Sequence, residues 1–267
     1  MKEKISLLPE HIINQIKAGE VVESPATLLK ELIENSIDAQ SSHIEISVSE
    51  DLTEYISIKD NGLGIDKDSL ALAFTRHATS KISNFNDIYQ LQSFGFRGEA
   101  LASIASISNI KCRTTRNKKT SIATLNKGNI SDVIEQQENA PQGTELIIKN
   151  IFQNTPARLK FIRSKKAEKN KLKRIIDVFV ISNPQVSFII DLGENEKQYY
   201  PSLKSDDAIK KRIIQVVSGA KKKLNSNDIL HENFQYKNHH ISFYATINAT
   251  KGASNKKQIL IVNNRYF

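Results

Sequence analysis

The amino-acid sequence predicts an α+β protein with roughly two domains, and three observations support this class. The chain has 267 residues, and a domain of ordinary size takes about 150. Hydrophobic residues make up 39% and charged residues 25% of the chain, which suits a buried core and excludes wholesale disorder. Helix and strand patterns follow each other in mixed order, so we expect packed α and β layers and not a doubly wound parallel sheet.

The first predicted helix covers residues 26–38. Ser24 can cap the free backbone N–H groups of its first turn, and Pro25 follows at the first helical position, where proline is favoured. Apolar residues then recur at helical spacing along one side: Leu28, Leu29, Leu32, Ile33 and Ile37. We therefore expect one face of this helix to be buried.

Two short strands and a turn follow this helix. Alternating apolar residues predict strands at 44–48 and 56–58, and the second leads directly into Asp-Asn-Gly-Leu-Gly at 60–64. The residue types of this turn tolerate positive φ angles. Asp66 can cap a short helix that extends to Phe74.

The remainder of the chain predicts a loop, two helices and several strands. Segment 75–98 is polar and punctuated by Gly and Ser, which predicts a long loop. One helix is expected to end before Asn183 and another to cover 208–217, with a domain boundary near 201–207. Strand patterns recur at 107–113, 122–125, 144–149, 186–191, 241–247 and 259–262.

Positive charge is concentrated in one segment. The net charge is +9, and residues 157–174 contain nine basic side chains and one acid, a local charge of +8. Apolar residues at helical spacing in and after this segment predict a helix with a solvated basic face, and the same face could bind a polyanion. Both interpretations stay open. Lysine runs at 221–223 and 256–257 keep nucleic acid among the candidate partners.

Several classes of protein are disfavoured by the sequence. The longest stretch worth testing as a membrane span, residues 100–110, is too short and too rich in serine. The N-terminus does not resemble a signal peptide. The single cysteine, Cys112, excludes an internal disulfide, and six scattered histidines disfavour a zinc site. We therefore expect a soluble, cytoplasmic protein with no membrane partner.

Polar residues of the first helix and of the following turn are candidate site residues. Glu31, Asn35 and Asp38 fall at i, i+4 and i+7 and share one helix face at the margin of the apolar stripe. Taken alone, this pattern is typical of a solvated helix edge. Asp60, followed by glycines, adds a carboxylate at a strand end, which can accept a hydrogen bond from the amine of a flat ligand.

A third feature could bind phosphate. Glycines in the segment 95–101 precede a predicted helix of Ala, Leu and Ile, and a helix start offers free N–H groups to phosphate oxygens. The sequence contains no Gly-x-x-x-x-Gly-Lys-Ser/Thr motif, so a nucleotide site here would not be a P-loop.

Together these motifs resemble the MutL family of DNA mismatch repair ATPases, within the GHKL group of gyrase, heat-shock chaperones and histidine kinases. The resemblance covers the whole chain, from the N-terminal arm at 16–22 to 262–265. The helix and the Asp-x-Gly-x-Gly turn alone indicate only the GHKL group. The motifs specific to the family are Arg-His-Ala-Thr-Ser-Lys at 76–81, Gly-Phe-Arg-Gly-Glu-Ala-Leu at 95–101 and Asn-Thr-Pro-Ala-Arg at 154–158.

The resemblance implies a fold and an ATP site. The expected fold is a GHKL (Bergerat-type) two-layer α/β sandwich with a mixed sheet at 1–200, followed by a truncated ribosomal S5 domain-two-like α/β domain at 207–267. Glu31 is implied to be the general base for the attacking water, and Asn35 the ligand of Mg²⁺. The implied lid over the triphosphate consists of Thr79, Ser80, Lys81, Gly95, Phe96, Arg97, Gly98, Glu99 and Ala100.

The implied adenine contact lies at the glycine-containing turn. Asp60 would accept a hydrogen bond from the adenine amino group, and Gly62 and Gly64 would let the backbone lie against the base. Thr144 resembles the family residue that supports Asp60 from a neighbouring strand. His77, in the lid segment, is expected to be structural.

The implied partners are the mismatch-recognition protein MutS, DNA bound largely without sequence preference, and a second copy in the full-length protein. In the family, a lysine of the second domain reaches the γ-phosphate from a segment beyond 263–265, and this chain ends at Phe267. We therefore expect a weak ATPase, and keep open the alternative of an ATP-dependent interaction module that does not hydrolyse ATP. A histidine kinase and a gyrase-like topoisomerase are disfavoured, because no acceptor-histidine bundle and no cleavage domain are recognisable.

Overall fold

The computed structural model describes residues 7–82, 84, 87, 93–95, 97–131, 133–137, 140–162, 164–194, 196–218, 224–237, 239–246, 259–262 and 265–266. Phe96, Arg163, both lysine runs and residues 263–264 lie outside this described part. The chain divides into two compact units: residues 1–175 with 188–199, and residues 176–187 with 200–267. The domain bounds expected from the sequence, 1–200 and 207–267, stay predictions.

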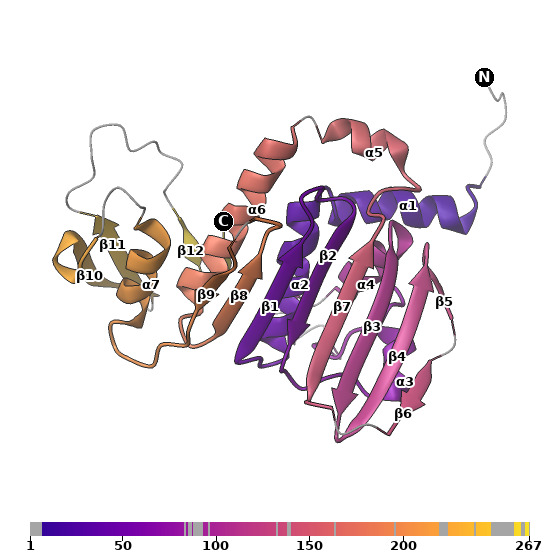
Figure 1. Ribbon diagram of the computed structural model, residues 1–267, viewed down its shortest axis with the longest axis horizontal. Helices are drawn as coiled ribbons and strands as arrows, with labels where there is room; N and C mark the ends of the chain where they lie inside the picture. The colour runs from indigo at the N-terminus through magenta and orange to yellow at the C-terminus, as the bar shows by residue number, and fades with distance from the viewer. Residues whose placement is uncertain are drawn as a thin grey trace. The chain divides into compact units, whose positions relative to one another are not determined.

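The first unit is built on a nine-stranded sheet with the order β5-β4-β3-β7-β2-β1-β8-β9, in which β6 also pairs with β4 (Figure 1). Neighbours from β4 to β1 along this order pair antiparallel. The strands are β1 (His43–Val48), β2 (Tyr55–Asp60), β3 (Asn109–Arg116), β4 (Lys119–Asn126), β5 (Asn129–Ile130), β6 (Ile134–Gln136), β7 (Gly143–Lys149), β8 (Ser187–Asp191) and β9 (Gln198–Tyr200).

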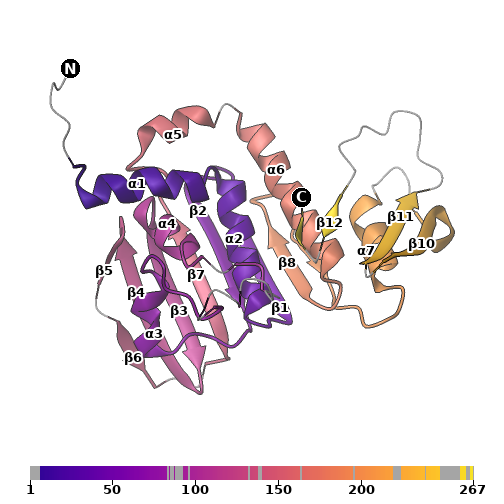
Figure 2. The same ribbon diagram turned by 180° about the vertical axis from the view of Figure 1, so that it is seen from behind.

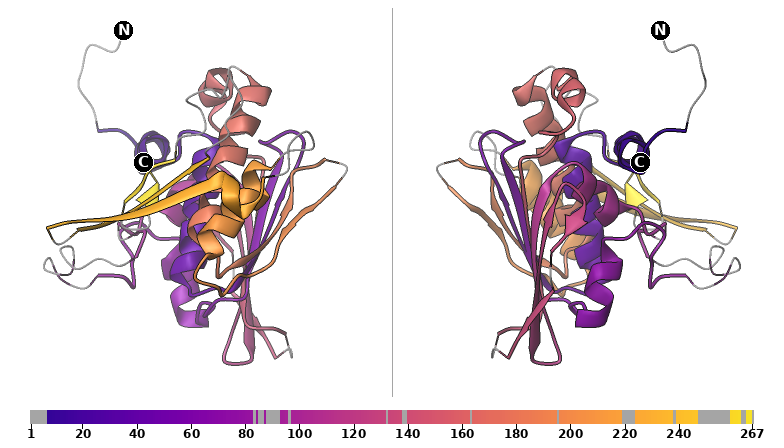
Figure 3. Two further views of the ribbon diagram at one scale, coloured as in Figure 1. Left: turned by 90° about the vertical axis from the view of Figure 1, so that its left-hand side faces the viewer. Right: turned by 90° about the vertical axis from the view of Figure 1, so that its right-hand side faces the viewer.

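Helices cover one face of this sheet, and the other face is open (Figures 1 and 2). The edge-on views in Figure 3 show the same two layers. The helices of the covering layer are α1 (Glu10–Val21), α2 (Pro25–Asp38), α3 (Lys67–Ala73) and α4 (Ala100–Ser106). The predicted α+β class, with packed α and β layers, is confirmed.

Strand register places the apolar residues on the covered face. One row across five strands consists of Ile46, Ile58, Leu146, Cys112 and Ala123, all buried. The adjacent row on the open face is charged and alternates in sign, with Glu45, Lys59, Glu145 and Arg113 in register. Apolar residues on one face and charged residues on the other are typical of an antiparallel sheet with one solvated side.

Helix α2 forms as its sequence predicts. Ser24 Oγ accepts a hydrogen bond from the Thr27 N–H at 3.4 Å, and Pro25 occupies the first helical position. Four of the five apolar stripe residues are classed as buried: Leu28, Leu29, Leu32 and Ile33. The predicted buried face is therefore confirmed, and it fixes which residues of α2 lie at its margin.

Two local predictions were wrong. Helix α3 does start after Asp66, but the Asp66 carboxylate lies 3.3 Å from Arg116 Nη1 in an ion pair instead of capping the helix. The basic segment forms two helices, α5 (Pro156–Phe161) and α6 (Lys165–Ser182), instead of one. Pro156 occupies the first position of α5. Ser164 Oγ accepts a hydrogen bond from the Ala167 N–H at the start of α6, so this helix begins anew.

The second unit contains the end of α6, helix α7 (Ala208–Val217), a 3₁₀ turn at Ser226–Asp228 and two strand pairs. The strands are β10 (Ile229–Tyr236) with β11 (His239–Thr246), and β12 (Ile261–Val262) with β13 (Arg265–Tyr266). The bounds of α7 agree with the predicted helix, whereas β10 was not predicted.

A buried arginine ties α7 to the segment after α6 within this unit. Arg212 is 0% exposed, and its Nη2 donates to the carbonyls of Val186 at 2.8 Å and Pro184 at 3.3 Å. Its guanidinium carbon lies 5.5 Å from the centre of the Tyr200 ring. Backbone carbonyls and an aromatic face thus replace water around a buried cation.

Candidate active site

The site residues of α2 lie at the edge of its buried face. Glu31 and Asn35 are half-buried, and the Asp38 side chain is only 7% exposed. Burial raises the pKa of Glu31, and the positive charges of Lys30 and Lys81 partly oppose this rise. A carboxylate whose pKa is raised by desolvation is a better proton acceptor than one in water.

The Asp60 carboxylate is held at the end of β2 by donors on both sides. Its Oδ2 accepts from Ser36 Oγ at 2.9 Å, and its Oδ1 accepts from the Gly62 N–H at 2.8 Å. Burial raises the pKa of Asp60, and these hydrogen bonds partly oppose the rise. The carboxylate is thus fixed in orientation.

A threonine pair supports this end of the sheet. Thr144 of β7 lies directly opposite Asp60 of β2 in the antiparallel register, so it is on the neighbouring strand as expected. Its hydroxyl oxygen lies 3.1 Å from Thr114 Oγ1, which also accepts from the Ile65 N–H at 2.8 Å. The hydroxyl pair therefore links β7, β3 and the chain just after the turn.

The glycines of the turn are required by close contacts within the protein. A Cβ atom at Gly62 would lie 2.6 Å from the Ala39 carbonyl oxygen. Gly64 has a φ of +69°, and a Cβ there would lie 2.3 Å from the carbonyl oxygen of Thr115. Both positions therefore need glycine for the fold itself, and their contact with a nucleotide base stays a prediction.

Lys81 and Gly95 of the predicted lid contact the polar face of α2. Lys81 Nζ donates to Asn35 Oδ1 at 3.1 Å and to Asp38 Oδ2 at 2.5 Å. Asp38 also accepts from the backbone N–H groups of Phe94 at 2.9 Å and Gly95 at 3.3 Å. The Asp38 carboxylate thus binds two stretches of chain that lie 43 and 56–57 positions after it in the sequence.

The other described lid residues form local contacts. Thr79 Oγ1 accepts from the Lys81 N–H at 3.1 Å, and the Gly98 carbonyl accepts from the His77 N–H at 2.9 Å. Glu99 precedes α4, which begins at Ala100 as predicted. Ser80 and Arg97 are exposed.

Three contributors to the site were not assigned a role from the sequence. Ser36 and Thr114 hold the Asp60 region through their hydroxyls. Asp38 was placed on the face of Glu31 and Asn35 but given no contact. A signal existed for Ser36, because a polar side chain on the buried side of an amphipathic helix needs a partner.

A second carboxylate of α2 has a perturbed pKa. Burial raises the pKa of Glu34 to about 7, although Lys30 Nζ lies 3.6 Å from its Oε1. Between pH 4.5 and about 7, the folded protein therefore keeps a proton that the unfolded chain releases. In this window the contribution of Glu34 to the free energy of unfolding falls as pH rises.

We expect Glu34→Gln to remove this pH dependence, because an amide does not titrate. Relative to the parent, the variant should gain up to about 3 kcal/mol of unfolding free energy between pH 5 and 8. Urea denaturation at pH 5, 6, 7 and 8 measures the difference. A stability difference that stays constant over this range would contradict the burial of an ionisable Glu34.

The basic segment uses many of its charges within the protein. Lys165 Nζ lies 2.6 Å from Asp51, and both Lys169 and Lys173 contact Glu194, at 3.2 and 2.7 Å. Arg158 Nη1 donates to the Val22 carbonyl at 3.1 Å. The apolar stripe of α6 is buried, at Leu172, Ile175, Ile176 and Phe179. The predicted buried stripe is thus confirmed for α6, while Lys160 and Lys166 are exposed. Binding of a polyanion by the basic segment stays a prediction.

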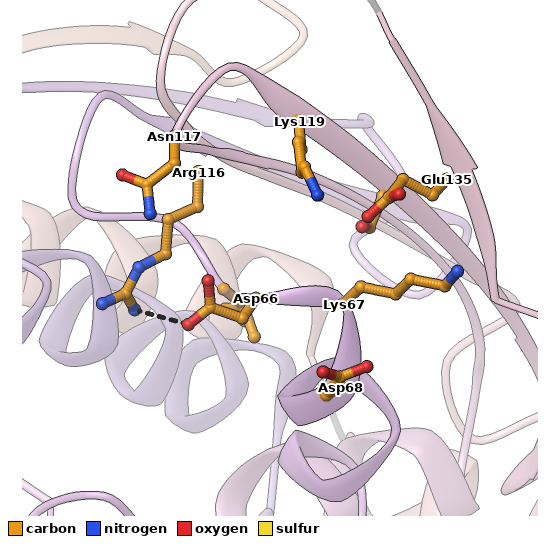
Figure 4. Close-up of a pocket in the computed structure, with 9 residues that line it drawn as sticks. Asp66, Lys67, Asp68, Arg116, Asn117, Lys119 and Glu135 are labelled. Atoms are coloured by element: carbon orange, nitrogen blue, oxygen red, sulfur yellow. Dashed lines mark ion pairs between the residues drawn. The ribbon is translucent and has the colours of Figure 1, made fainter.

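A separate pocket of about 430 Å³ lies beside the β3–β4 turn and the start of α3 (Figure 4). Its charges balance, with three basic and three acidic side chains, and it contains the Asp66–Arg116 ion pair. It lies outside the predicted site residues. The lining residues are Ile65, Asp66, Lys67, Asp68, Arg116, Asn117, Lys119, Ser121 and Glu135.

Two features are absent from the part of the chain that the structure describes. None of their helices combines the length and apolarity that crossing a membrane requires. No group of three or more His, Cys, Asp or Glu side chains among them could hold a metal ion.

Comparison with known proteins identifies relatives of the chain. Residues 23–154 match the family described as histidine kinase-, DNA gyrase B- and HSP90-like ATPase. DNA mismatch repair protein MutL of Thermosipho africanus is 43% identical over 196 residues, which are 73% of this chain and 34% of that protein. MutL of Lactococcus lactis subsp. cremoris is 45% identical over 188 residues, 70% of this chain and 28% of that protein. The chain thus spans about a third of the length of these curated relatives.

Solved structures show the same fold. The N-terminal domain of a DNA repair protein is 25% identical with a TM-score of 0.73, and the match covers 96% of this chain and 78% of that one. The Aquifex aeolicus MutL ATPase domain complexed with ADP is 24% identical with a TM-score of 0.65, covering 92% and 84%. The similarity extends over both units of the chain.

Proposed function

Because this chain belongs to the histidine kinase-, DNA gyrase B- and HSP90-like ATPases and is a relative of the MutL N-terminal region, we propose that it binds and hydrolyses ATP in DNA mismatch repair. The observation that carries this proposal is the buried Asp60 carboxylate, which accepts hydrogen bonds from Ser36 and Gly62. It lies beside the helix that presents Glu31 and Asn35. A base-recognition group and two candidate groups for phosphate chemistry thus lie on adjoining elements. Nucleotide-driven closure and pairing of two copies would couple mismatch recognition to later repair steps.

The proposed base is Glu31. Phosphoryl transfer to water needs a group that orients the attacking water and accepts its proton, and a half-buried carboxylate of raised pKa suits this task. The exposed Arg97 and the Lys81 ammonium are proposed to neutralise phosphate charge. Thr79, Ser80, Gly95, Phe96, Gly98, Glu99 and Ala100 are proposed as the other members of the lid over the triphosphate.

The donor set suits Mg²⁺ as the partner of the phosphates. Asn35 offers an amide oxygen, which is a ligand type that this hard cation prefers, and that oxygen already accepts from an ammonium group. Asn35 would hold the ion together with phosphate oxygens and water. When bound, Mg²⁺ supplies charge neutralisation at the phosphates.

We expect Asn35→Ala to weaken binding of Mg²⁺-ADP by at least about tenfold, because a direct ligand of the ion is lost. Binding of ADP in EDTA should change much less. Calorimetry with and without Mg²⁺ measures both affinities. Equal losses under the two conditions would instead assign Asn35 to the nucleotide itself.

The proposed partners are DNA, the mismatch-recognition protein MutS and a second copy of the full-length protein, in the cytoplasm. For DNA, the exposed Lys160 and Lys166 are the candidate contacts, since several neighbouring lysines are paired within the protein. Binding through phosphates should be largely independent of sequence and weaken steeply with salt.

We expect the double variant Lys160→Glu, Lys166→Glu to lower the salt slope of DNA binding by about two, one for each lost phosphate contact. Fluorescence anisotropy with two unrelated duplexes over a range of salt concentrations measures this slope. Lys149→Glu, which makes one such charge reversal at the exposed end of β7, is the control and should leave the slope unchanged. An unchanged slope would remove α5 and α6 from the DNA-contact surface.

The function is tested by single-turnover hydrolysis of ATP and by calorimetric ADP binding on the 267-residue chain. Slow but measurable turnover, abolished by EDTA, is expected. Binding without turnover would favour the interaction module that does not hydrolyse ATP. Absence of binding would contradict the proposed function.

A further inference from the structure

The strongest unexplained feature of the site is the position of the Lys81 amino group. Its Nζ donates at 3.1 Å to Asn35 Oδ1, the oxygen proposed to hold Mg²⁺, and at 2.5 Å to Asp38 Oδ2. The Lys81 and Asp38 side chains are 22% and 7% exposed, so this is a largely desolvated ion pair and not a surface contact. An ammonium group therefore contacts the oxygen that is proposed to bind Mg²⁺.

Asp38 also fixes the backbone on the other side of this amino group. The carboxylate accepts from the N–H groups of Phe94 at 2.9 Å and Gly95 at 3.3 Å. A Cβ atom at Gly95 would lie 3.4 Å from Lys81 Nζ, which shows how closely the two stretches approach. Asp38 is thus the common acceptor for Lys81 and for the chain at 94–95.

We infer that Lys81 is a displaceable placeholder for Mg²⁺, held on Asn35 by Asp38, and that Mg²⁺ binds by exchange with this amino group. The inference rests on the proposed function, because it concerns the cation that accompanies ATP. Asp38 is a positioning residue in this exchange and contacts no reacting atom. Lys81 released from Asn35 becomes available to the phosphates.

Electrostatics require such an exchange. Asn35 has one side-chain oxygen, and an ammonium and a divalent cation that both approached it would repel each other strongly in a partly buried site. The two cations therefore compete, and any preference for one lowers the apparent affinity of the other. The ammonium also pairs with Asp38, a largely buried carboxylate that needs a counter-charge.

The experiment measures ADP binding to the 267-residue chain by calorimetry at a series of free Mg²⁺ concentrations. ADP is used so that hydrolysis does not interfere. In Lys81→Met, which keeps the length of the stem and removes the charge, the Mg²⁺ concentration at half-maximal effect should fall by roughly fivefold or more, the lower end of ordinary coupling between linked ligands. Lys81→Arg should keep the parent value, because it keeps the charge.

Two comparisons separate this exchange from other roles. A lost phosphate contact would lower ADP affinity at saturating Mg²⁺ without moving the Mg²⁺ midpoint, and that result would overturn the placeholder role. Lys165→Met removes an ammonium from a more exposed ion pair with Asp51, at 2.6 Å, and should leave the midpoint unchanged. If the parent chain binds no ADP at any Mg²⁺ concentration, the proposed function fails and the exchange fails with it.

A second measurement tests Asp38 without any nucleotide. Amide hydrogen exchange at Phe94 and Gly95 should be faster in Asp38→Asn, because a neutral amide oxygen is a weaker acceptor than a carboxylate. Asp51→Asn is the matched control and should not alter these two amides. Unchanged exchange at both amides in a folded Asp38→Asn protein would overturn the positioning role of Asp38 and leave the ADP result to decide the role of Lys81.

Discussion

Replacing Glu31 with alanine is expected to lower the rate of ATP hydrolysis by roughly 10²- to 10⁴-fold, the usual contribution of a general base. Affinity for ATP should change little, because the base acts on water and not on the phosphates of bound nucleotide. Glu31 is half-buried on α2, and Lys30, Lys81 and Arg97 contribute positive charge around it. Single-turnover hydrolysis and calorimetric binding measure the two quantities separately.

The pH dependence gives an independent check of this role. A base must be deprotonated, and burial raises the pKa of Glu31 above the ordinary value of 4.5. The hydrolysis rate should therefore fall as pH drops through a value above 4.5, and Glu31→Gln should lack this acidic limb. Glu45→Ala, on the open face of the sheet, is the control. Loss of binding parallel to loss of hydrolysis in Glu31→Ala would contradict a role confined to the water.

Local patterns predicted the part of the fold that presents the site. The start of α2 follows from Ser24 and Pro25, whose effects act within one helical turn. The strands β1 and β2 follow from the alternation of apolar and polar residues. This alternation matches the folded structure, because one face of the sheet is buried and the other is open. Asp60 was therefore placed correctly at the end of a strand.

Other features depend on contacts between distant residues and could not be predicted locally. Lysines of α6 form ion pairs with acidic residues outside the helix. Lys165, for example, pairs with Asp51, 114 positions away in the sequence. Asp38 bonds the backbone 56 and 57 positions later. Helix α1 begins after Pro9 without a capping side chain in the described structure, so its start carries no sequence signal of the kind Ser24 provides. For Lys165 and Asp38, a distant partner and not the local sequence determines the contact.

Base selectivity should depend on Asp60. Its carboxylate is fixed by Ser36 Oγ and the Gly62 N–H at 2.9 and 2.8 Å, so it presents acceptors in a constant direction. Adenine carries an exocyclic amine where guanine carries a carbonyl, and a carbonyl would face the carboxylate as a second acceptor. We expect GTP to compete for the site only at concentrations roughly 10²-fold or more above those of ATP, because buried polar groups would be left unpaired.

Asp60→Asn tests the same hydrogen bond from the protein side. Because the Gly62 N–H demands an acceptor, the new amide oxygen should face it and the amide NH₂ should take the other position. A donor then meets the adenine amine, and ATP affinity should fall by about 10- to 100-fold, equivalent to about 1.4 to 2.8 kcal/mol.

Burial raises the pKa of Asp60, so its ionised form is costly in the folded protein and a neutral amide should not lower the free energy of unfolding. Calorimetry with ATP and GTP, paired with urea denaturation of each variant, distinguishes lost recognition from lost folding. Normal ATP binding by Asp60→Asn, or competition by GTP at concentrations similar to ATP, would exclude Asp60 as the group that selects the base.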